Sequence, residues 1–287
     1  MLARLQELWT IFRRDRLGVV GLLIFTLFLL VALFAPYLAP YDPMESLYRP
    51  DGSFARQDPP SWRHPFGTTR MGRDVLSQVI IGSRVALLVG LTSAFITTFI
   101  GTNIGLIAGY YGGWIDDLLM RLTDIVYGIP FLPFAIILVA ILGPGLTNTI
   151  IAIVLISWRT TARVIRSQVL TLKQRTFIEA ARLTGASNLR IIYRHLVPNV
   201  LPLSLVYTAL NLGWAIMTEA SISFLGYGDP RLVSWGSILF SAYVAQAVYD
   251  AWWWVGPPGL AITLLVMSGF FISRAVEEIA NPRLRER

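Results

Sequence analysis

Residues 17–41 read LGVVGLLIFTLFLLVALFAPYLAPY, and no charged side chain interrupts them. A helix needs about 20 apolar residues to cross the hydrocarbon core of a bilayer, so this run predicts a membrane span. A cleaved signal peptide is the alternative, because arginines precede the run. The run is long for a signal sequence, however, and lacks a clear small-residue cleavage site.

The composition of the whole chain also favours a membrane protein. Of the 287 residues, 55% are hydrophobic and only 14% are charged, whereas a soluble domain carries about a quarter charged residues. The net charge of +7 comes from arginines that lie at the ends of apolar runs and in loops. That distribution is typical of membrane orientation and argues against a nucleic-acid surface. With no Cys and two His, a thiolate or His-rich metal site is not expected.

Further apolar runs bring the expected number of spans to six. They cover 85–115, 125–158, 196–218 and 251–273. The run 125–158 is too long for one helix, and Gly143, Pro144 and Gly145 break it into a predicted hairpin of two spans. The second of these is expected to continue past Arg159, whose long side chain can snorkel to the interface.

A small-residue stripe marks the second span. Gly101, Gly105 and Gly109 recur every four residues, so they lie on one helical face. Such a stripe allows another helix to approach closely, and we expect helix packing there.

Positive charge sets the expected direction of the spans, because Lys and Arg concentrate on the cytoplasmic side. With six spans, three clusters fall inside: the N-terminal arginines up to Arg16, the loop after the fourth span, and the C-terminal arginines from Arg274 onward. A seventh span at 232–249 would put the last cluster outside. That segment is therefore expected to be external, either interfacial or partly re-entrant.

The predicted outer loop, 42–84, is long and carries charges of both signs. At its end Val75, Leu76, Val79 and Ile80 fall on one helical face. This pattern predicts an amphipathic helix on the outer surface that leads into the second span.

The longest inner connection, 176–199, reads TFIEAARLTGASNLRIIYRHLVPN. Helical patterns flank Gly185, a residue that readily ends a helix. Ser187 or Asn188 can cap the following helix, and Pro198 is expected to stop that helix before the fifth span. A helix–Gly–helix element on the inner side can dock into a partner. The alternative is a basic loop that rests on anionic lipid.

The EAA sequence of this segment, its glycine and its HLVPN ending resemble the EAA loop of ABC importer permeases. Three further stretches, 64–84, 109–121 and 220–230, resemble the C-type inner-membrane subunit of dipeptide and oligopeptide importers. The resemblance covers nearly the whole chain. It implies a type I ABC importer permease fold with six transmembrane helices and a cytoplasmic coupling helix. The corresponding organisation is a cytoplasmic N-terminus with the first transmembrane helix (1–41), an external loop (42–84), a permease core (85–280) with a coupling loop (168–199), and a cytoplasmic tail (281–287).

The resemblance also implies which residues contact the ATPase. These are Glu179, Ala180, Ala181, Gly185, His195, Pro198 and Asn199. The alanines allow close packing, and Glu179 acts as a charged or hydrogen-bonding group, with local pairing to Arg175 or Arg182 as a further interpretation.

The implied assembly holds a second homologous permease subunit, two ATPase subunits and an extracytoplasmic substrate-binding protein. It lies in the inner (cytoplasmic) membrane with both termini of this chain in the cytoplasm. No phosphate-loop motif G-x-x-x-x-G-K-[ST] occurs here, so ATP and Mg²⁺ are expected on the ATPase chains and no cofactor or enzymatic activity on this one. Cargo is expected to be peptides, with nickel complexes, opines or oligosaccharides as alternatives.

Charged or polar residues within spans are the candidates for lining a pathway. The fifth span offers Asn211, Trp214, Met217 and Glu219, and bonding of Glu219 to a neighbouring helix or outer loop is the competing interpretation. An ATP-independent secondary transporter remains the alternative function, although no internal duplication supports it. An intramembrane enzyme would require motifs that the chain lacks.

Overall fold

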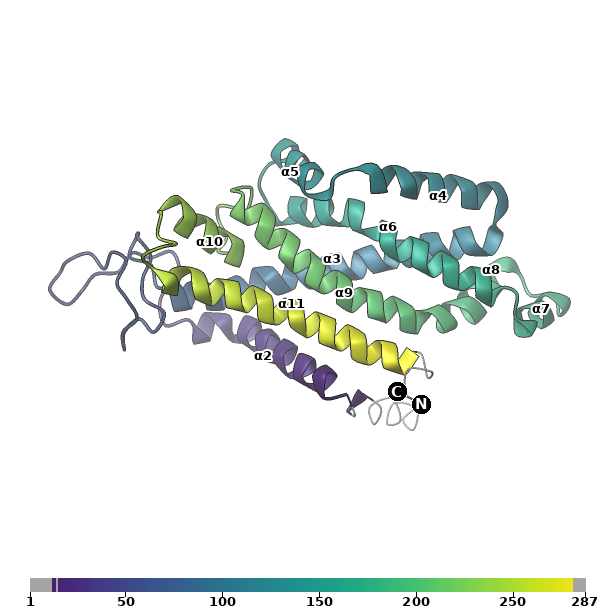
Figure 1. Cartoon of the computed structure of the whole chain (residues 1–287), viewed down its shortest axis with the longest axis horizontal. Coiled ribbons are helices and arrows are strands. Elements are labelled where there is room, and N and C mark those ends of the chain that lie inside the picture. Colours follow the sequence, from purple (N-terminus) through teal and green to yellow (C-terminus); the bar gives the residue numbers. More distant parts are fainter. Residues whose placement is uncertain (1–11, 14, 281–287) are drawn as a thin grey trace.

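The computed structural model describes residues 12–13 and 15–280, and nearly all of its regular structure is helical. The elements are α2 (Arg16–Leu38), α3 (Val75–Tyr111), α4 (Gly113–Gly128), α5 (Phe131–Leu142), α6 (Leu146–Leu172), α7 (Thr176–Leu183), α8 (Asn188–Arg190), the π-helical turn η1 (Ile191–Leu196), α9 (Val197–Phe224), α10 (Trp235–Val244) and α11 (Trp252–Ala280). The long helices lie roughly along the longest axis of the molecule (Figure 1). The predicted tail 281–287 and two residues of the N-terminal arginine cluster, Arg4 and Arg14, lie outside the described residues.

The six-span prediction is confirmed in number by the described residues, with one change in shape. Five helices are long and apolar enough to cross a membrane, and counting the bent pair α4 and α5 as one span brings the number to six. That pair is bent by 88°, so the third span is not the single straight helix that the apolar run suggested. Ile129 is extended (φ −84°, ψ 123°) before Pro130, because the proline ring disfavours helical backbone in the preceding residue.

The start of α3 differs from the sequence prediction. Asp74 caps the helix by accepting a hydrogen bond from the backbone N–H of Ser77, and the helix then runs unbroken to Tyr111. The expected amphipathic helix at 74–84 is therefore the first section of α3, not a separate surface element. Val75 is fully buried, and Val79 packs half-buried against the same apolar core.

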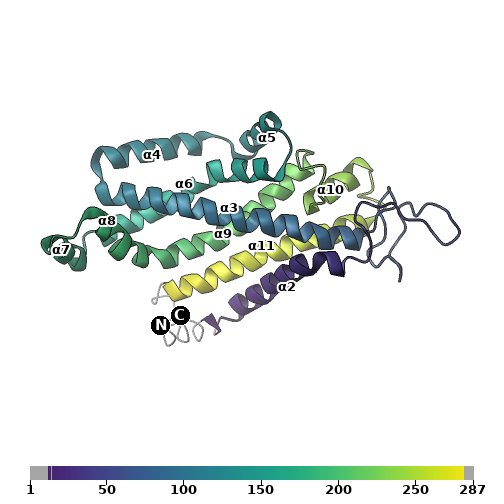
Figure 2. The same ribbon diagram turned by 180° about the vertical axis from the view of Figure 1, so that it is seen from behind.

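The predicted glycine stripe packs against α6. A Cβ placed on Gly101, Gly105 or Gly109 would come within 2.6–2.8 Å of atoms of α6, well inside van der Waals contact. The two helices lie side by side along their length (Figure 2). The absence of side chains on α3 therefore sets the distance between these two helices.

The expected stop at Pro198 is wrong. Helical backbone continues from Asn188 to Phe224, with the π-helical turn η1 directly before the proline. Proline lacks a backbone donor and its ring collides with the carbonyl four residues earlier. A π-helical turn changes that spacing, so the chain accommodates Pro198 without ending the helix.

The bundle has two distinct ends. At one end lie α7, the start of α2 and the end of α11; at the other lie α10 and the loop that joins α2 to α3 (Figure 1). α10 is short and apolar, and Trp235, Gly236, Ile238 and Ala242 are buried against the rest of the chain. The segment 232–249 is thus not a seventh span.

Candidate functional site

The segment between α6 and α9 is anchored to the bundle by an apolar cluster. Ile178 of α7 is fully buried and Ala181 is 8% exposed. They pack with Ile191, Ile192 and Leu196 of η1, and this cluster reaches the ends of α3 and α6. Burial of this kind stabilises the segment against independent motion. We call residues 176–196 the inner hairpin, after the side of the membrane that the charge pattern predicts for it.

Hydrogen bonds fix the turn of the inner hairpin. Gly185 has φ +77°, a conformation that glycine adopts without a Cβ clash, and the N–H of Ala186 donates to the carbonyl of Ala181 at 3.0 Å. The hydroxyl of Tyr110 on α3 donates to Oδ1 of Asn188 at 2.8 Å. The predicted helix end at Gly185 is confirmed, and Ser187 is the residue that caps the next turn.

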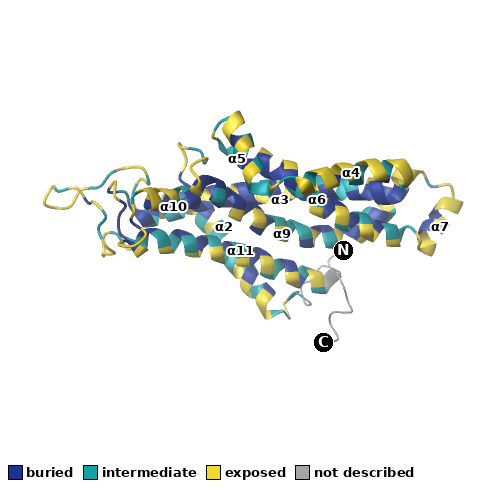
Figure 3. Cartoon of the chain, turned by 45° about the horizontal axis from the view of Figure 1, so that its top comes forward, coloured by how far each residue is buried: buried dark blue, intermediate teal, exposed yellow. Residues whose placement is uncertain are grey.

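The outer surface of the inner hairpin is exposed and partly apolar. Leu183 is 89% exposed and Leu189 is 64% exposed, and α7 projects beyond the long helices (Figure 3). Leu189 therefore does not share the burial of Ile192 and Leu196, which follow it at helical spacing.

The predicted ATPase contacts occupy different environments on the inner hairpin and the start of α9. Glu179, Ala180, Gly185, Pro198 and Asn199 are exposed, His195 is half-buried and Ala181 is buried. Within the described residues Glu179 forms no ion pair. Arg182 instead lies 5.6 Å from the centre of the Tyr110 ring.

The four predicted pathway residues fall into two groups. Asn211 donates its amide to the hydroxyls of Thr98 (3.1 Å) and Thr161 (3.3 Å), so it joins α9 to α3 and α6. Glu219 is 3% exposed and accepts a hydrogen bond from Ser223 at 2.6 Å.

The other two, Trp214 and Met217, are 45% and 44% exposed. The ring of Trp214 lies 5.5 Å from that of Phe131 on α5. A pathway-lining role for this set stays a prediction.

A row of charges between α4 and α6 was not predicted from the sequence as a functional feature. Arg166 forms a bidentate ion pair with Asp116, with hydrogen bonds of 2.5 and 2.6 Å. Arg163 forms an ion pair with Asp124 at 2.5 Å. Arg159 donates to the carbonyl of Val126 at 3.2 Å, and its reach to the membrane interface stays a prediction. The spacing of these arginines along one face of α6 was the available signal.

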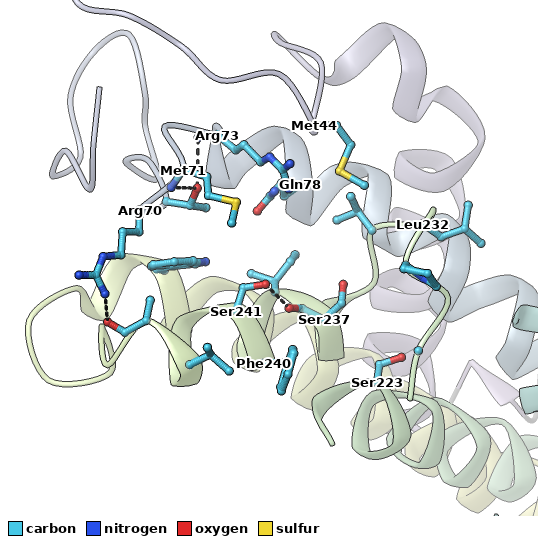
Figure 4. Close-up of a pocket in the computed structure, with 18 of the residues that line it drawn as sticks. Met44, Arg70, Met71, Arg73, Gln78, Ser223, Leu232, Ser237, Phe240 and Ser241 are labelled. Atoms are coloured by element: carbon cyan, nitrogen blue, oxygen red, sulfur yellow. Dashed lines mark hydrogen bonds between the residues drawn. The ribbon is translucent and has the colours of Figure 1, made fainter. Parts of the chain in front are cut away.

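A cavity of about 670 Å³ opens at the α10 end of the bundle. Arg73 and Met71 from the outer loop face Ser237 and Ser241 of α10 across it (Figure 4). Arg70 closes one side by donating to the carbonyl of Ala245 at 3.1 Å. Among the described residues there is no group of three or more His, Cys, Asp or Glu side chains that could hold a metal ion.

The bundle of apolar helices with an exposed helical hairpin at one end defines a multi-pass membrane protein. The chain belongs to the family of binding-protein-dependent transport system inner membrane components, whose model matches residues 101–286. The N-terminal transmembrane domain of oligopeptide transport permease C matches residues 4–60. The resemblance seen in the sequence is therefore confirmed, and the chain is a permease subunit of an ABC importer.

Relatives match over nearly their whole length. A dipeptide transport system permease protein DppC of Alkalihalophilus pseudofirmus is 38% identical, with 95% of this chain and 88% of the relative covered. A di/tripeptide transport system permease protein DppC of Pseudomonas aeruginosa is 38% identical, covering 98% and 93%. A glutathione transport system permease protein GsiD of Escherichia coli is 37% identical, covering 97% and 90%.

One solved structure supports the fold. A chain of the MetNI methionine ABC transporter, in an inward-facing conformation, superposes with a TM-score of 0.56. It is 21% identical and the match covers 71% of this chain and 94% of that chain. The likeness shows the permease fold and nothing about cargo.

Proposed function

We propose that this chain forms half of a pathway for peptides or similar small solutes and that it transmits the work of ATPase subunits through the segment 168–199. Peptide cargo is supported by relatives named for transport of dipeptides, di/tripeptides and glutathione. Nickel complexes, opines and oligosaccharides are the alternative cargoes. In this proposal the chain lies in the inner membrane with both termini in the cytoplasm.

The observation that carries the coupling proposal is the construction of the inner hairpin. The side of the hairpin that faces the bundle packs in a buried cluster that includes Ile178 and the ends of α3 and α6. Leu183 and Leu189 of the same hairpin are exposed. A force applied to the exposed residues of the hairpin would therefore reach α3 and α6 through packed side chains, which resist deformation.

The proposed partners follow the two ends of the bundle. Two ATPase subunits, which bind ATP and Mg²⁺, contact the α7 end of this chain and of a second, homologous permease subunit. An extracytoplasmic binding protein delivers cargo at the opposite end, where the cavity beside α10 and the outer loop offers a concave, partly cationic surface.

The experiment that tests coupling compares two glycines that both have a positive φ. Gly185 (φ +77°) lies in the inner hairpin and Gly52 (φ +82°) in the outer loop, and at neither glycine would an added Cβ have a neighbouring atom within 4 Å. Each also donates its N–H to the carbonyl three residues earlier. Proline fixes φ near −65° and removes that donor, so it perturbs both turns alike.

In vesicles that contain the complete transporter, Gly185→Pro is expected to abolish dipeptide uptake while the chain remains inserted. Gly52→Pro is expected to retain uptake and ATP hydrolysis. Normal uptake by Gly185→Pro, with normal binding of the ATPase, would overturn the coupling role. Uptake by the native chain without any ATPase subunit would favour a secondary transporter instead.

A further inference from the structure

Three arginines on α6 face α4, and they differ in how their charge is compensated. Arg166 has Asp116 and Arg163 has Asp124, each within ion-pair distance. Arg159 has no carboxylate partner among the residues that the structure describes. The row therefore carries one uncompensated positive charge.

An aromatic ring holds this charge in place. The guanidinium carbon of Arg159 lies 4.8 Å from the centre of the Tyr127 ring, and that of Arg163 lies 4.2 Å from the same centre. Tyr127 is itself fixed, because its hydroxyl donates to Thr160 at 3.1 Å. A guanidinium over a tyrosine face is stabilised by the ring quadrupole, so the two cations share one preformed platform.

The platform lies near the middle of the bundle rather than at either end. Arg159 is the middle residue of α6 (Leu146–Leu172), which places it about 20 Å from either end of the helix. Two residues further on, Thr161 bonds to Asn211 near the middle of α9. A cation at this depth is costly against lipid, and such residues normally face a bundle interior or a water-filled cavity.

We propose that Arg159, with Arg163 and Tyr127, forms a carboxylate-binding station in the translocation pathway. The ligand class is a small solute with a free carboxylate, as at the C-terminus of a peptide. This inference rests on the proposed function, since it takes the pathway and its cargo from it. Arg159 has the donor geometry that suits a carboxylate, because a guanidinium presents several N–H groups in one plane.

The chain contains no Cys, so a single introduced thiol reports on this surface. Leu155 lies one helical turn before Arg159 and is 48% exposed; Ile151 lies two turns before it and is 41% exposed. In the complete transporter, a Leu155→Cys variant is treated with an anionic or a cationic methanethiosulfonate. With each rate divided by that reagent's rate with free cysteine, the anionic reagent is expected to react about tenfold faster than the cationic one. The preference is expected to be smaller in the Ile151→Cys variant, because the charge is farther away.

The charge at position 159 is then changed in the Leu155→Cys background. Arg159→Gln is expected to abolish the anionic preference, whereas Arg159→Lys retains it and shows that the fold is kept. No labelling by either reagent would place the face against lipid or protein and overturn the proposal. Equal rates for both reagents with Arg159 present, each relative to free cysteine, would overturn it as well.

The cargo is tested in the same vesicles with dialanine, dialanine amide and the binding protein during turnover. Dialanine is expected to slow labelling when Arg159 is present but not in Arg159→Gln, and the amide is expected to have no effect. Dialanine uptake without protection would refute the station while leaving the proposed function intact. Absence of any dialanine uptake would refute the peptide cargo, and the station for it would fall too.

Discussion

Packing between α3 and α6 predicts opposite effects for the same substitution at two glycines. At Gly105, a Cβ would lie 2.6 Å from the carbonyl oxygen of Ala162 and 2.8 Å from Cβ of Ile165. At Gly259, inside α11, nothing lies within 4 Å of the corresponding position. Both are helical, so Gly→Ala brings the same gain in helix propensity of about 1 kcal/mol.

The magnitude follows from the space available. A methyl group needs roughly 3.5 Å to its neighbours, so Gly105→Ala requires α6 to move away by close to 1 Å. Overpacking of this kind costs about 1–3 kcal/mol. We therefore expect Gly105→Ala to be less stable than Gly259→Ala by about that amount, because the propensity gain is common to both.

Thermal unfolding of the purified chain in detergent, followed by tryptophan fluorescence, measures this difference. A shift of roughly 2–4 °C in Tm per kcal/mol is expected for a chain of this size. Gly259→Ala is expected to keep or raise the Tm, and Gly105→Ala to lower it. Equal Tm values for the two variants would refute the argument that the glycine stripe sets the distance between the helices.

Three further predictions concern the ends of the bundle. Tyr110→Phe removes the 2.8 Å bond to Asn188 and is expected to cost about 1 kcal/mol locally, seen as faster hydrogen exchange in the inner hairpin and not in α10. Asp74→Ala removes the cap of α3 and the 2.9 Å contact of Asp74 with His64, and is expected to cost more than the roughly 1 kcal/mol of a cap alone; an unchanged urea midpoint would contradict it. The hydrogen bonds from Arg231 hold the pKa of Asp229 below its usual value, so that pair stabilises the loop at neutral pH. Its contribution is expected to persist above about pH 4 and to fade only as pH drops through the lowered pKa, which limited proteolysis of the loop would detect.

Local patterns predicted a large share of this fold. The apolar run 17–41 covers all of α2 except its first residue, Arg16. The four-residue recurrence of Gly101, Gly105 and Gly109 predicted a packed face. Gly185 was predicted to end α7 because few other residues adopt positive φ. These features depend on residues close together in the chain, and for that reason the sequence alone was sufficient.

The rest depends on contacts between distant segments. The pairs Arg166–Asp116 and Arg163–Asp124 join residues on two helices whose register the sequence does not reveal. The effect of a proline also depended on its surroundings. Pro130 accompanies an 88° bend, whereas the π-helical turn before it lets Pro198 stay within a helix.

Contact between α7 and an ATPase subunit is the central claim, and site-specific photocrosslinking measures it most directly. A photoreactive phenylalanine analogue replaces Leu183 at the tip of α7, or Trp62 in the outer loop as the control, since both side chains are almost fully exposed. In the complete transporter we expect an adduct with the ATPase subunit from position 183 and none from position 62. If position 183 gave no ATPase adduct, or both positions gave the same one, the inner hairpin would not be the ATPase contact.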